Sequence, residues 1–296
     1  MTGVLLIDKP LGPTSHDVVA RVRRITRQRS IGHTGTLDPR ASGLLPLVLG
    51  RATKLASLLT GGDKTYDATI RLGFRTDTDD EEGEPMAERA ETLPDTDAIA
   101  AALDAFRGTF DQVPPDHSAK RVDGVRAYAL ARRATPAVLK PVTVTVRHLD
   151  VLGRDADLLV VRVTATAGFY VRALARDLGT RLGCGGHLAA LRRIRSGHFA
   201  IEDAITLDVA ETLGDNLPSR LLSPADALPH LRSVSVTETG LKRAVHGNDI
   251  RPEHVEEQWV ASEDQRQPVK VLAADGHLVA LAEVRAGALH PVVVLG

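Results

Sequence analysis

Two glycines and a proline surround a single aspartate in residues 32–39, which read Gly-His-Thr-Gly-Thr-Leu-Asp-Pro. Glycine permits backbone angles and close approaches that other residues cannot adopt, whereas Pro39 fixes its own φ and disfavours helical geometry at Asp38. A basic, helix-like segment precedes these residues, and an apolar run from Ala41 to Leu49 follows them. We therefore expect a rigid loop between two ordered elements, with the Asp38 carboxylate held in one direction.

A carboxylate held in this way is a candidate nucleophile or general base. An Asp-Pro pair beside glycine is also common in ordinary turns, where the aspartate bonds only to its own backbone. His33 alone is more often structural than catalytic, and its distance along the chain does not require contact with Asp38. The chemistry of these eight residues leaves both interpretations open.

The segments Ala-Ser-Gly-Leu-Leu-Pro at 41–46 and Gly-Arg-Ala-Thr-Lys at 50–54 extend this pattern, and Asp-Lys-Pro at 8–10 precedes it. Together they resemble the signature of the TruB family of tRNA pseudouridine-55 synthases. The resemblance implies that Asp38 is the catalytic nucleophile. It also implies that His33 occupies or stabilises the space left when a base is flipped out of the RNA.

Residues 64–73 alternate in character and predict a strand that opens with Lys-Thr-Tyr. A tyrosine in a strand is usually a half-buried packing residue. The segment resembles the second motif of the family, Lys-x-Tyr. The resemblance implies that Tyr66 stacks on the target base and helps in proton transfer, and that Lys64 belongs to the substrate-binding residues.

The segment Gly-Phe-Tyr-Val-Arg-Ala-Leu at 168–174 resembles the fourth family motif, with Val171 in place of isoleucine. The resemblance makes Arg172 the ion-pair partner that keeps Asp38 ionised and oriented, and places Tyr170 in the same pocket. The alternative is a surface arginine at the start of a helix. Burial of Arg172 between apolar neighbours would demand a carboxylate partner, which weakens that alternative.

Leu-Arg-Arg at 191–193 also resembles a family motif, which implies that Leu191 lines the active site and that Arg192 and Arg193 lie towards the RNA. Residues 112–128 resemble a further family region with departures: His117 replaces an aromatic residue, Lys120 an aliphatic one and Arg121 a lysine. Arginine is not a neutral replacement for lysine where geometry matters. For Arg121 we expect only a loose role, in substrate contact or packing.

The net charge of -1 argues against a nucleic-acid-binding protein, but the charges are segregated. Residues 1–60 hold nine Lys/Arg against three Asp/Glu, whereas residues 77–98 hold ten Asp/Glu against one Arg. Residues 168–198 hold six arginines against one aspartate. This segregation makes RNA binding plausible without establishing it, since charged runs are also typical of solvated surfaces. For the acidic residues 76–84 we expect a solvated loop, because their spacing does not match a calcium-binding EF-hand.

Helical spacing of apolar residues predicts a helix that begins after Thr14 or Ser15 and ends near Arg29. Its arginines either face phosphates or form a solvated basic face. The run 44–49 is compatible with strand or helix. Other patterns predict strands at 4–7, 142–152 and 158–166 and a helix at 99–106.

The 296 residues suggest one large domain with an appendage, or two domains. From about residue 231 short strands are predicted, at 268–272, 278–284 and 291–295. The resemblance implies an α+β pseudouridine synthase fold, with a mixed, mostly antiparallel sheet, in residues 1–230. It implies a small β-rich, PUA-like RNA-binding domain in residues 231–296.

The single cysteine, Cys184, rules out an internal disulfide and any zinc site that needs several cysteines. No histidines have a recognisable metal-ligand spacing, and no P-loop or dinucleotide fingerprint is present, so we predict no metal and no cofactor. The N-terminal apolar run is too short for a signal peptide, and no later run approaches the roughly 18 residues of a membrane span. We expect a cytoplasmic monomer without an obligatory protein partner.

The implied reaction converts the T-loop uridine (position 55) of tRNA to pseudouridine: the N1–C1′ bond breaks and C5 bonds to C1′. Whether Asp38 attacks C6 or C1′, or acts at C2′, stays open. Two other interpretations are a guide-RNA-dependent pseudouridine synthase and a tRNA-binding folding chaperone with secondary catalysis. The acidic residues 77–84 and the lack of long basic tails favour the stand-alone enzyme. The set Asp38, Tyr66 and Arg172 argues against a purely binding protein.

Overall fold

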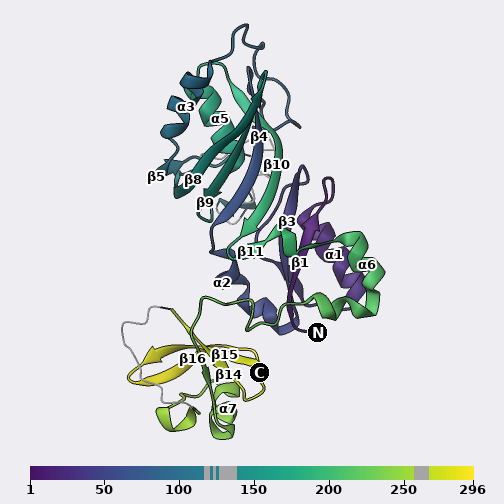
Figure 1. Cartoon of the computed structure of the whole chain (residues 1–296), viewed down its shortest axis with the longest axis vertical. Coiled ribbons are helices and arrows are strands. Elements are labelled where there is room, and N and C mark those ends of the chain that lie inside the picture. Colours follow the sequence, from purple (N-terminus) through teal and green to yellow (C-terminus); the bar gives the residue numbers. More distant parts are fainter. Residues whose placement is uncertain (117–120, 123–124, 127–138, 257–266) are drawn as a thin grey trace.

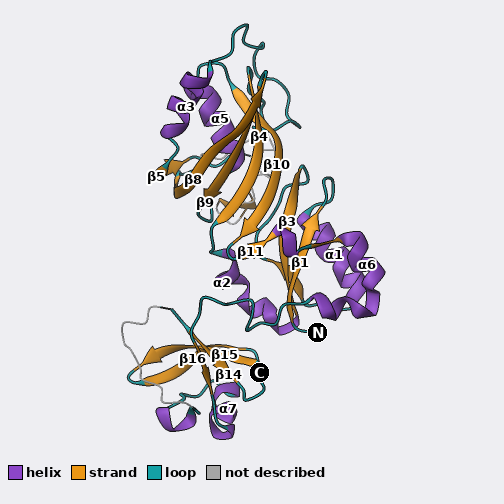
Figure 2. Ribbon diagram, viewed as in Figure 1, coloured by secondary structure: helices purple, strands orange, loops and turns teal. Residues whose placement is uncertain are grey.

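The computed structural model describes residues 1–116, 121–122, 125–126, 139–256 and 267–296. A large body and a smaller C-terminal module lie end to end along the long axis of the molecule (Figure 1). Strands and helices are interleaved along the chain, and each body has its own sheet (Figure 2). The α+β class is therefore confirmed.

The large sheet contains ten strands of the described part of the chain: β1 (Gly3–Lys9), β2 (Ile31–His33), β3 (Ala41–Leu49), β4 (Lys64–Leu72), β5 (Gly108–Gln112), β8 (Val142–Asp155), β9 (Leu158–Ala165), β10 (Gly186–Ser196), β11 (Phe199–Ala200) and β12 (Ile205–Thr206). Their order is β12–β1–β3–β10–β4–β9–β8–β5, with β2 beside β3 and β11 beside β10. Only the β1–β12 and β3–β10 pairs are parallel within this described sheet. The sheet is mixed and mostly antiparallel, as expected.

Helices cover different parts of this sheet. They are α1 (Ser15–Thr26), the 3-10 helix η1 (Gly50–Leu55), α2 (Ala56–Thr60), α3 (Thr96–Asp104), α5 (Val171–Arg181), η2 (Ile201–Asp203), α6 (Leu207–Leu213) and η3 (Gly214–Arg220). The helices α3 and α5 pack on β4, β8, β9 and β10, whereas α1, α6 and η3 pack on β1 and β3. No helix in the described ranges is both long enough and apolar enough to cross a membrane.

The run 44–49 forms a strand, β3, because both of its faces are buried. Leu45, Leu47 and Leu49 contact the core under α1, whereas Leu44 and Val48 contact the opposite core, under η1 and α2. A strand buried on both faces loses the polar alternation that would identify it in the sequence. This explains why the pattern alone does not distinguish strand from helix.

Helix α1 begins where the sequence predicts. Thr14 is its N-cap and forms a capping box with Asp17. The helix ends three residues before the predicted Arg29, because Arg27 adopts a left-handed conformation with φ 51°. The off-core Arg21 pairs with Asp208 and Glu211 at α6 instead of standing free for phosphates.

The C-terminal module contains a second sheet, in the order β13 (Ser233–Ser235), β14 (Val269–Leu272), β15 (Leu278–Arg285) and β16 (Ala288–Val294), with α7 (Glu238–Val245) and η4 (Pro252–His254) beside it. The predicted strands are present, although β16 begins earlier than expected. Arg51 and Lys54 of η1 donate to the carbonyls of Leu295 and Val294, at 2.9 and 2.7 Å. The signature residues 50–54 therefore bind the module to the large body.

Candidate active site

The Asp38 loop connects β2 to β3 and is held by its backbone. The Ser15 hydroxyl bonds to both the N–H and the carbonyl of Leu37, each at 2.9 Å. The Leu37 side chain is buried, and the Ala41 N–H donates to the Asp38 carbonyl at 3.0 Å. The loop is thus ordered, as the Gly and Pro pattern predicts, and it is held both by its own backbone and by Ser15 of α1.

Lys9 anchors the exit from this loop. Its side chain is fully buried, and Nζ donates to the carbonyls of Ala41 at 2.7 Å and Pro10 at 2.9 Å. Burial lowers the pKa of Lys9 to about 8; the Asp38 carboxylate opposes this shift and the Arg193 guanidinium adds to it. The Asp-Lys-Pro motif therefore supplies a buried donor that fixes the loop.

Arg172 lies in the first turn of α5 and contacts two carboxylates. Its Nη2 lies 3.0 Å from Oδ2 of Asp38, and its Nη1 lies 3.4 Å from Oδ2 of Asp80. The side chain of Arg172 is 9% exposed and that of Asp80 15% exposed, whereas that of Asp38 is 48% exposed. The guanidinium is thus enclosed, while the Asp38 carboxylate remains accessible to a ligand.

The expectation of a solvated acidic loop at 76–84 is wrong for Thr76 and Asp79. Thr76 and Asp79 are each only 2% exposed. Asp79 pairs with Arg75 at 3.1 Å and with Arg176 of α5 at 3.2 Å, and its carbonyl accepts from the Leu188 N–H. Burial raises the pKa of Asp79 against the opposing effect of both arginines.

The acidic segment is partly buried because Arg172 and Arg176, which are one helical turn apart on α5, bind the consecutive aspartates Asp80 and Asp79. Nothing in a run of acidic residues reveals that two arginines far along the chain will meet it. Asp80, which borders the Asp38–Arg172 pair, is a site residue that the sequence analysis missed.

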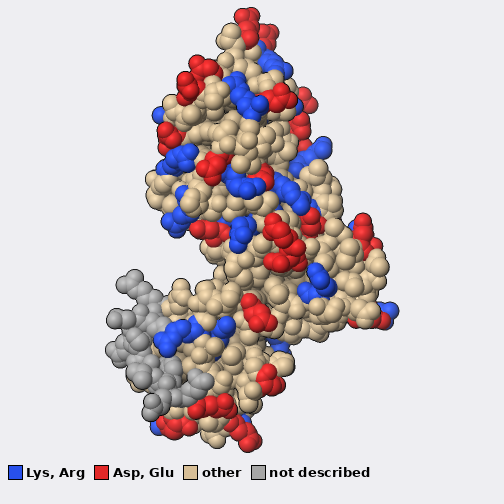
Figure 3. Space-filling view, viewed as in Figure 1, with Lys and Arg blue, Asp and Glu red and all other residues tan. Residues whose placement is uncertain are grey.

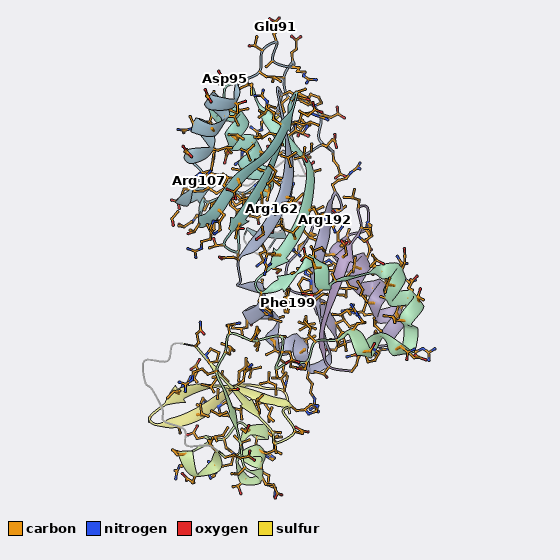
Figure 4. The ribbon with its side chains drawn as sticks, viewed as in Figure 1. Glu91, Asp95, Arg107, Arg162, Arg192 and Phe199 are labelled. Carbon is orange, nitrogen blue, oxygen red and sulfur yellow. The ribbon has the colours of Figure 1, made fainter. Side chains whose placement is uncertain are left out.

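The later acidic residues Glu91 and Asp95 lie elsewhere, at the end of the molecule farthest from the C-terminal module (Figure 4).

Two cavities of about 270 Å³ each border Asp38, Arg172 and Leu191. Tyr66 and Tyr170 line the first, together with the polypeptide at residues 35–37 and 166–169. Asp80 and Arg192 line the second. The structure thus brings Asp38, Tyr66, Tyr170, Arg172 and Leu191 to one cavity.

Lys64 also lines the first cavity, whereas His33 does not. The Lys64 ammonium donates to the carbonyls of Thr60 and Gly62, and burial, with a smaller effect of Arg193, lowers its pKa to about 8 against the effect of Asp63. His33 lines neither cavity and packs edge-on against His16, with ring centroids 5.5 Å apart. Burial, then His16 and Arg193, lower the pKa of His33.

The two consecutive arginines of β10 have different surroundings. Arg192 forms a two-bond ion pair with Asp8 of β1, at 3.0 and 2.8 Å (Figure 4 shows its place on the sheet). Arg193 is 1% exposed and donates to backbone carbonyls. The expectation that both guanidinium groups lie towards RNA is not met by Arg193, because the next residue of a strand points to the other face.

Arg121 begins the short strand β6 (Arg121–Val122), which pairs with β7 (Val125–Arg126). Its side chain, together with His117 and Lys120, lies outside the described residues.

Figure 3 shows the molecular surface hollowed between the large body and the C-terminal module, with Lys and Arg side chains on both.

Two family models match the chain. The TruB family pseudouridylate synthase N-terminal domain matches residues 23–171, and the tRNA pseudouridylate synthase B C-terminal domain matches residues 172–228. A tRNA pseudouridine synthase B of Solibacter usitatus is 42% identical, covering 100% of both chains. One of Thermobifida fusca is 43% identical, covering 99% of this chain and 98% of its own.

Solved structures give the same result at lower identity. The chain is similar to one in a Cbf5–Nop10–Gar1 complex, with a TM-score of 0.75 and 27% identity over 99% of this chain and 85% of the other. A chain in an H/ACA RNP bound to a substrate RNA containing 2'-deoxyuridine has a TM-score of 0.74 and 26% identity, over 99% of this chain and 85% of the other. The fold is therefore the pseudouridine synthase fold, and this chain belongs to the TruB family of pseudouridylate synthases.

Proposed function

We propose that this protein isomerises the T-loop uridine (position 55) of tRNA to pseudouridine, with Asp38 as the nucleophile. One observation carries the proposal: a half-exposed carboxylate is ion-paired to a buried arginine at the wall of a cavity that also contains two tyrosines. The full-length relatives named tRNA pseudouridine synthase B support tRNA as the substrate.

A uridine stacked in an RNA loop must leave the stack before an enzyme can reach its glycosidic bond, at a cost of a few kcal/mol. The cavity beside Asp38 has the residues to receive it. Tyr66 stacks on the flipped base, Leu191 gives an apolar contact, and Tyr170 closes the side next to α5. His33 stabilises the space that the base leaves in the RNA.

Covalent assistance by Asp38 divides the reaction into two easier steps. The N1–C1′ bond breaks, the uracil turns, and C5 bonds to C1′. The proton on C5 is then lost to solvent and N1 regains one, so the reaction needs no oxidant or energy source. Arg172 holds the carboxylate ionised and oriented, while Tyr66 assists the proton transfer from C5.

Binding of the rest of the tRNA rests on shape and phosphate contacts. We assign residues 1–230 to the catalytic domain and residues 231–296 to a PUA-like RNA-binding domain. Hydrogen bonds from Arg51 and Lys54 of η1 to the end of the module support this assignment, because they link it to the catalytic domain. Lys64, Arg121 and Arg192 are the other proposed substrate contacts in the catalytic domain. The proposed protein is a cytoplasmic monomer that needs no partner protein.

The similarity to chains in a Cbf5–Nop10–Gar1 complex and in an H/ACA RNP bound to a substrate RNA favours a second candidate, a guide-RNA-dependent synthase. Sequence identity favours the stand-alone enzyme, because this chain is 42–43% identical to the two tRNA pseudouridine synthases B but only 26–27% identical to the chains in those structures. An assay without any guide RNA separates the two. A tRNA-folding chaperone with secondary catalysis remains a third candidate.

The test measures tritium release from unmodified tRNA labelled at uridine C5, using wild type and Asp38→Asn. Primer extension after chemical modification locates the product. We expect release at the T-loop uridine alone, and none from the variant, while both proteins bind tRNA. Binding without release by the wild type would favour the chaperone or the guide-dependent enzyme. Equal release by both proteins would reduce Asp38 to a turn residue.

A further inference from the structure

Arg193 carries a buried charge that is bonded to the backbone of the Asp38 loop. Its Nε donates to the Leu44 carbonyl at 2.7 Å, Nη2 to the Gly35 carbonyl at 3.0 Å and Nη1 to the Thr36 carbonyl at 3.5 Å. None of the described acidic residues forms an ion pair with it. Two of these carbonyls precede Asp38 and one follows it, so a single guanidinium ties the two sides of the loop together.

The loop is shaped to admit this side chain. Arg193 lies opposite Gly43 in the parallel β10–β3 pairing, and Gly43 has a φ of +100°. A Cβ at Gly43 would lie 2.3 Å from the Arg193 carbonyl oxygen. A Cβ at Gly35 would lie 3.4 Å from Nη1 of Arg193. Gly43 therefore lets β3 approach the backbone of β10 closely, whereas a Cβ at Gly35 would make only an ordinary contact with the guanidinium.

Only arginine fits the donor geometry. A buried cation is costly unless its donors are satisfied, and the guanidinium presents a rigid, planar fork that stays protonated. A lysine in the same position would keep the charge but could not hold carbonyls on both sides of the loop in the same directions. Arg193 lines the first cavity beside Asp38, but it is only 1% exposed and its guanidinium already donates to three backbone carbonyls, which leaves little of it accessible to RNA.

We propose that Arg193 is a positioning residue: it fixes the backbone before and after Asp38, so that the carboxylate faces the bound uridine, and it does not contact RNA. The expected effect of Arg193 on turnover rests on the proposed function, whereas its effect on the loop does not. It replaces the role in RNA contact that the Leu-Arg-Arg resemblance implies for this residue.

The experiment compares wild type, Arg193→Lys and Arg195→Lys. Arg195 is an exposed arginine on the same strand and serves as the matched control. In single-turnover tritium release with saturating enzyme, we expect the rate constant of Arg193→Lys to fall about 100-fold, because a misplacement of about 1 Å has this effect. The amplitude and the Kd for tRNA stay at wild-type values, and Arg195→Lys keeps the wild-type rate constant.

Hydrogen exchange gives a readout that does not need turnover. The amides of residues 34–44 should exchange faster in Arg193→Lys than in wild type or Arg195→Lys, with unchanged exchange in β4 and β9. An unchanged exchange rate in this segment would overturn the inference. A wild type without turnover would overturn the proposed function, while exchange would still test the loop.

Two kinetic outcomes would also overturn the inference. A weaker Kd with an unchanged rate constant would make Arg193 an RNA contact. A lower amplitude with an unchanged rate constant would mean that the variant only reduces the fraction of folded enzyme.

Discussion

The Nη2 atom of Arg172 lies 3.0 Å from Oδ2 of Asp38, and the same guanidinium reaches Asp80 through Nη1 at 3.4 Å. Arg172 also donates to the Thr78 carbonyl at 3.3 Å. The position of the proposed nucleophile therefore depends on a second carboxylate, from the acidic segment 76–84. Asp80 binds Nη1 of Arg172 while Nη2 of the same guanidinium meets Asp38.

Asp80→Asn should lower kcat and leave the affinity for tRNA unchanged. The neutral amide keeps the size of the side chain but loses a charged hydrogen bond to Arg172, an interaction worth about 1.5–3 kcal/mol. We expect a loss in kcat of roughly 10- to 100-fold, measured as tritium release under saturating tRNA. Glu82→Gln is the control, because Glu82 lies on the same loop as Asp80 but pairs with the exposed Arg40 instead of with Arg172. If both variants behave alike, Asp80 does not position Arg172.

Gly43→Ala should destabilise the protein much more than Gly12→Ala. Both glycines have positive φ, +100° and +105°, so an alanine is strained at either position. At Gly43 the added Cβ also meets the backbone of β10, whereas at Gly12 nothing lies within 4 Å. We expect a loss of roughly 2–5 kcal/mol at Gly43 and about 1 kcal/mol at Gly12, measured by urea unfolding. Equal losses would show that β3 can move away from β10.

Lys9→Met should change how stability depends on pH. Below pH 8 the Lys9 ammonium is protonated in both the folded and unfolded states, and its burial disfavours the folded state. Between about pH 8 and 10.5 the unfolded chain still binds the proton that the folded protein has lost, so the free energy of unfolding gains a positive slope with pH. Lys64 contributes a similar slope in both proteins.

The measurement is urea unfolding of wild type and Lys9→Met at several pH values from 7 to 10.5. The variant should show a smaller rise of stability with pH than wild type across the alkaline range. Parallel curves would show that the pKa of Lys9 in the folded protein is close to its ordinary value.

The local sequence predicted the loop around Asp38, the capped start of α1 and most strands, although Ser15, Lys9 and Arg193 hold that loop in the folded protein. Pro39, the neighbouring glycines and the Thr14 cap act over a few residues, so their effect can be deduced without the fold. Family resemblance also predicted that Arg172, far along the chain, meets Asp38. Apolar spacing predicted α3 and the β8–β9 hairpin, because the spacing of apolar residues also acts over a few neighbouring positions.

The tertiary structure alone decided which polar groups became buried. Arg192 and Arg193 are adjacent and chemically identical, yet one pairs with Asp8 on one face of β10 and the other holds the Asp38 loop on the other face. The acidic residues 76–84 have the composition of a solvated loop, but α5 brings Arg172 and Arg176 against Asp80 and Asp79. Composition fixes the charge of a segment, whereas its burial depends on partners that only the long-range pairing of strands and helices brings into reach.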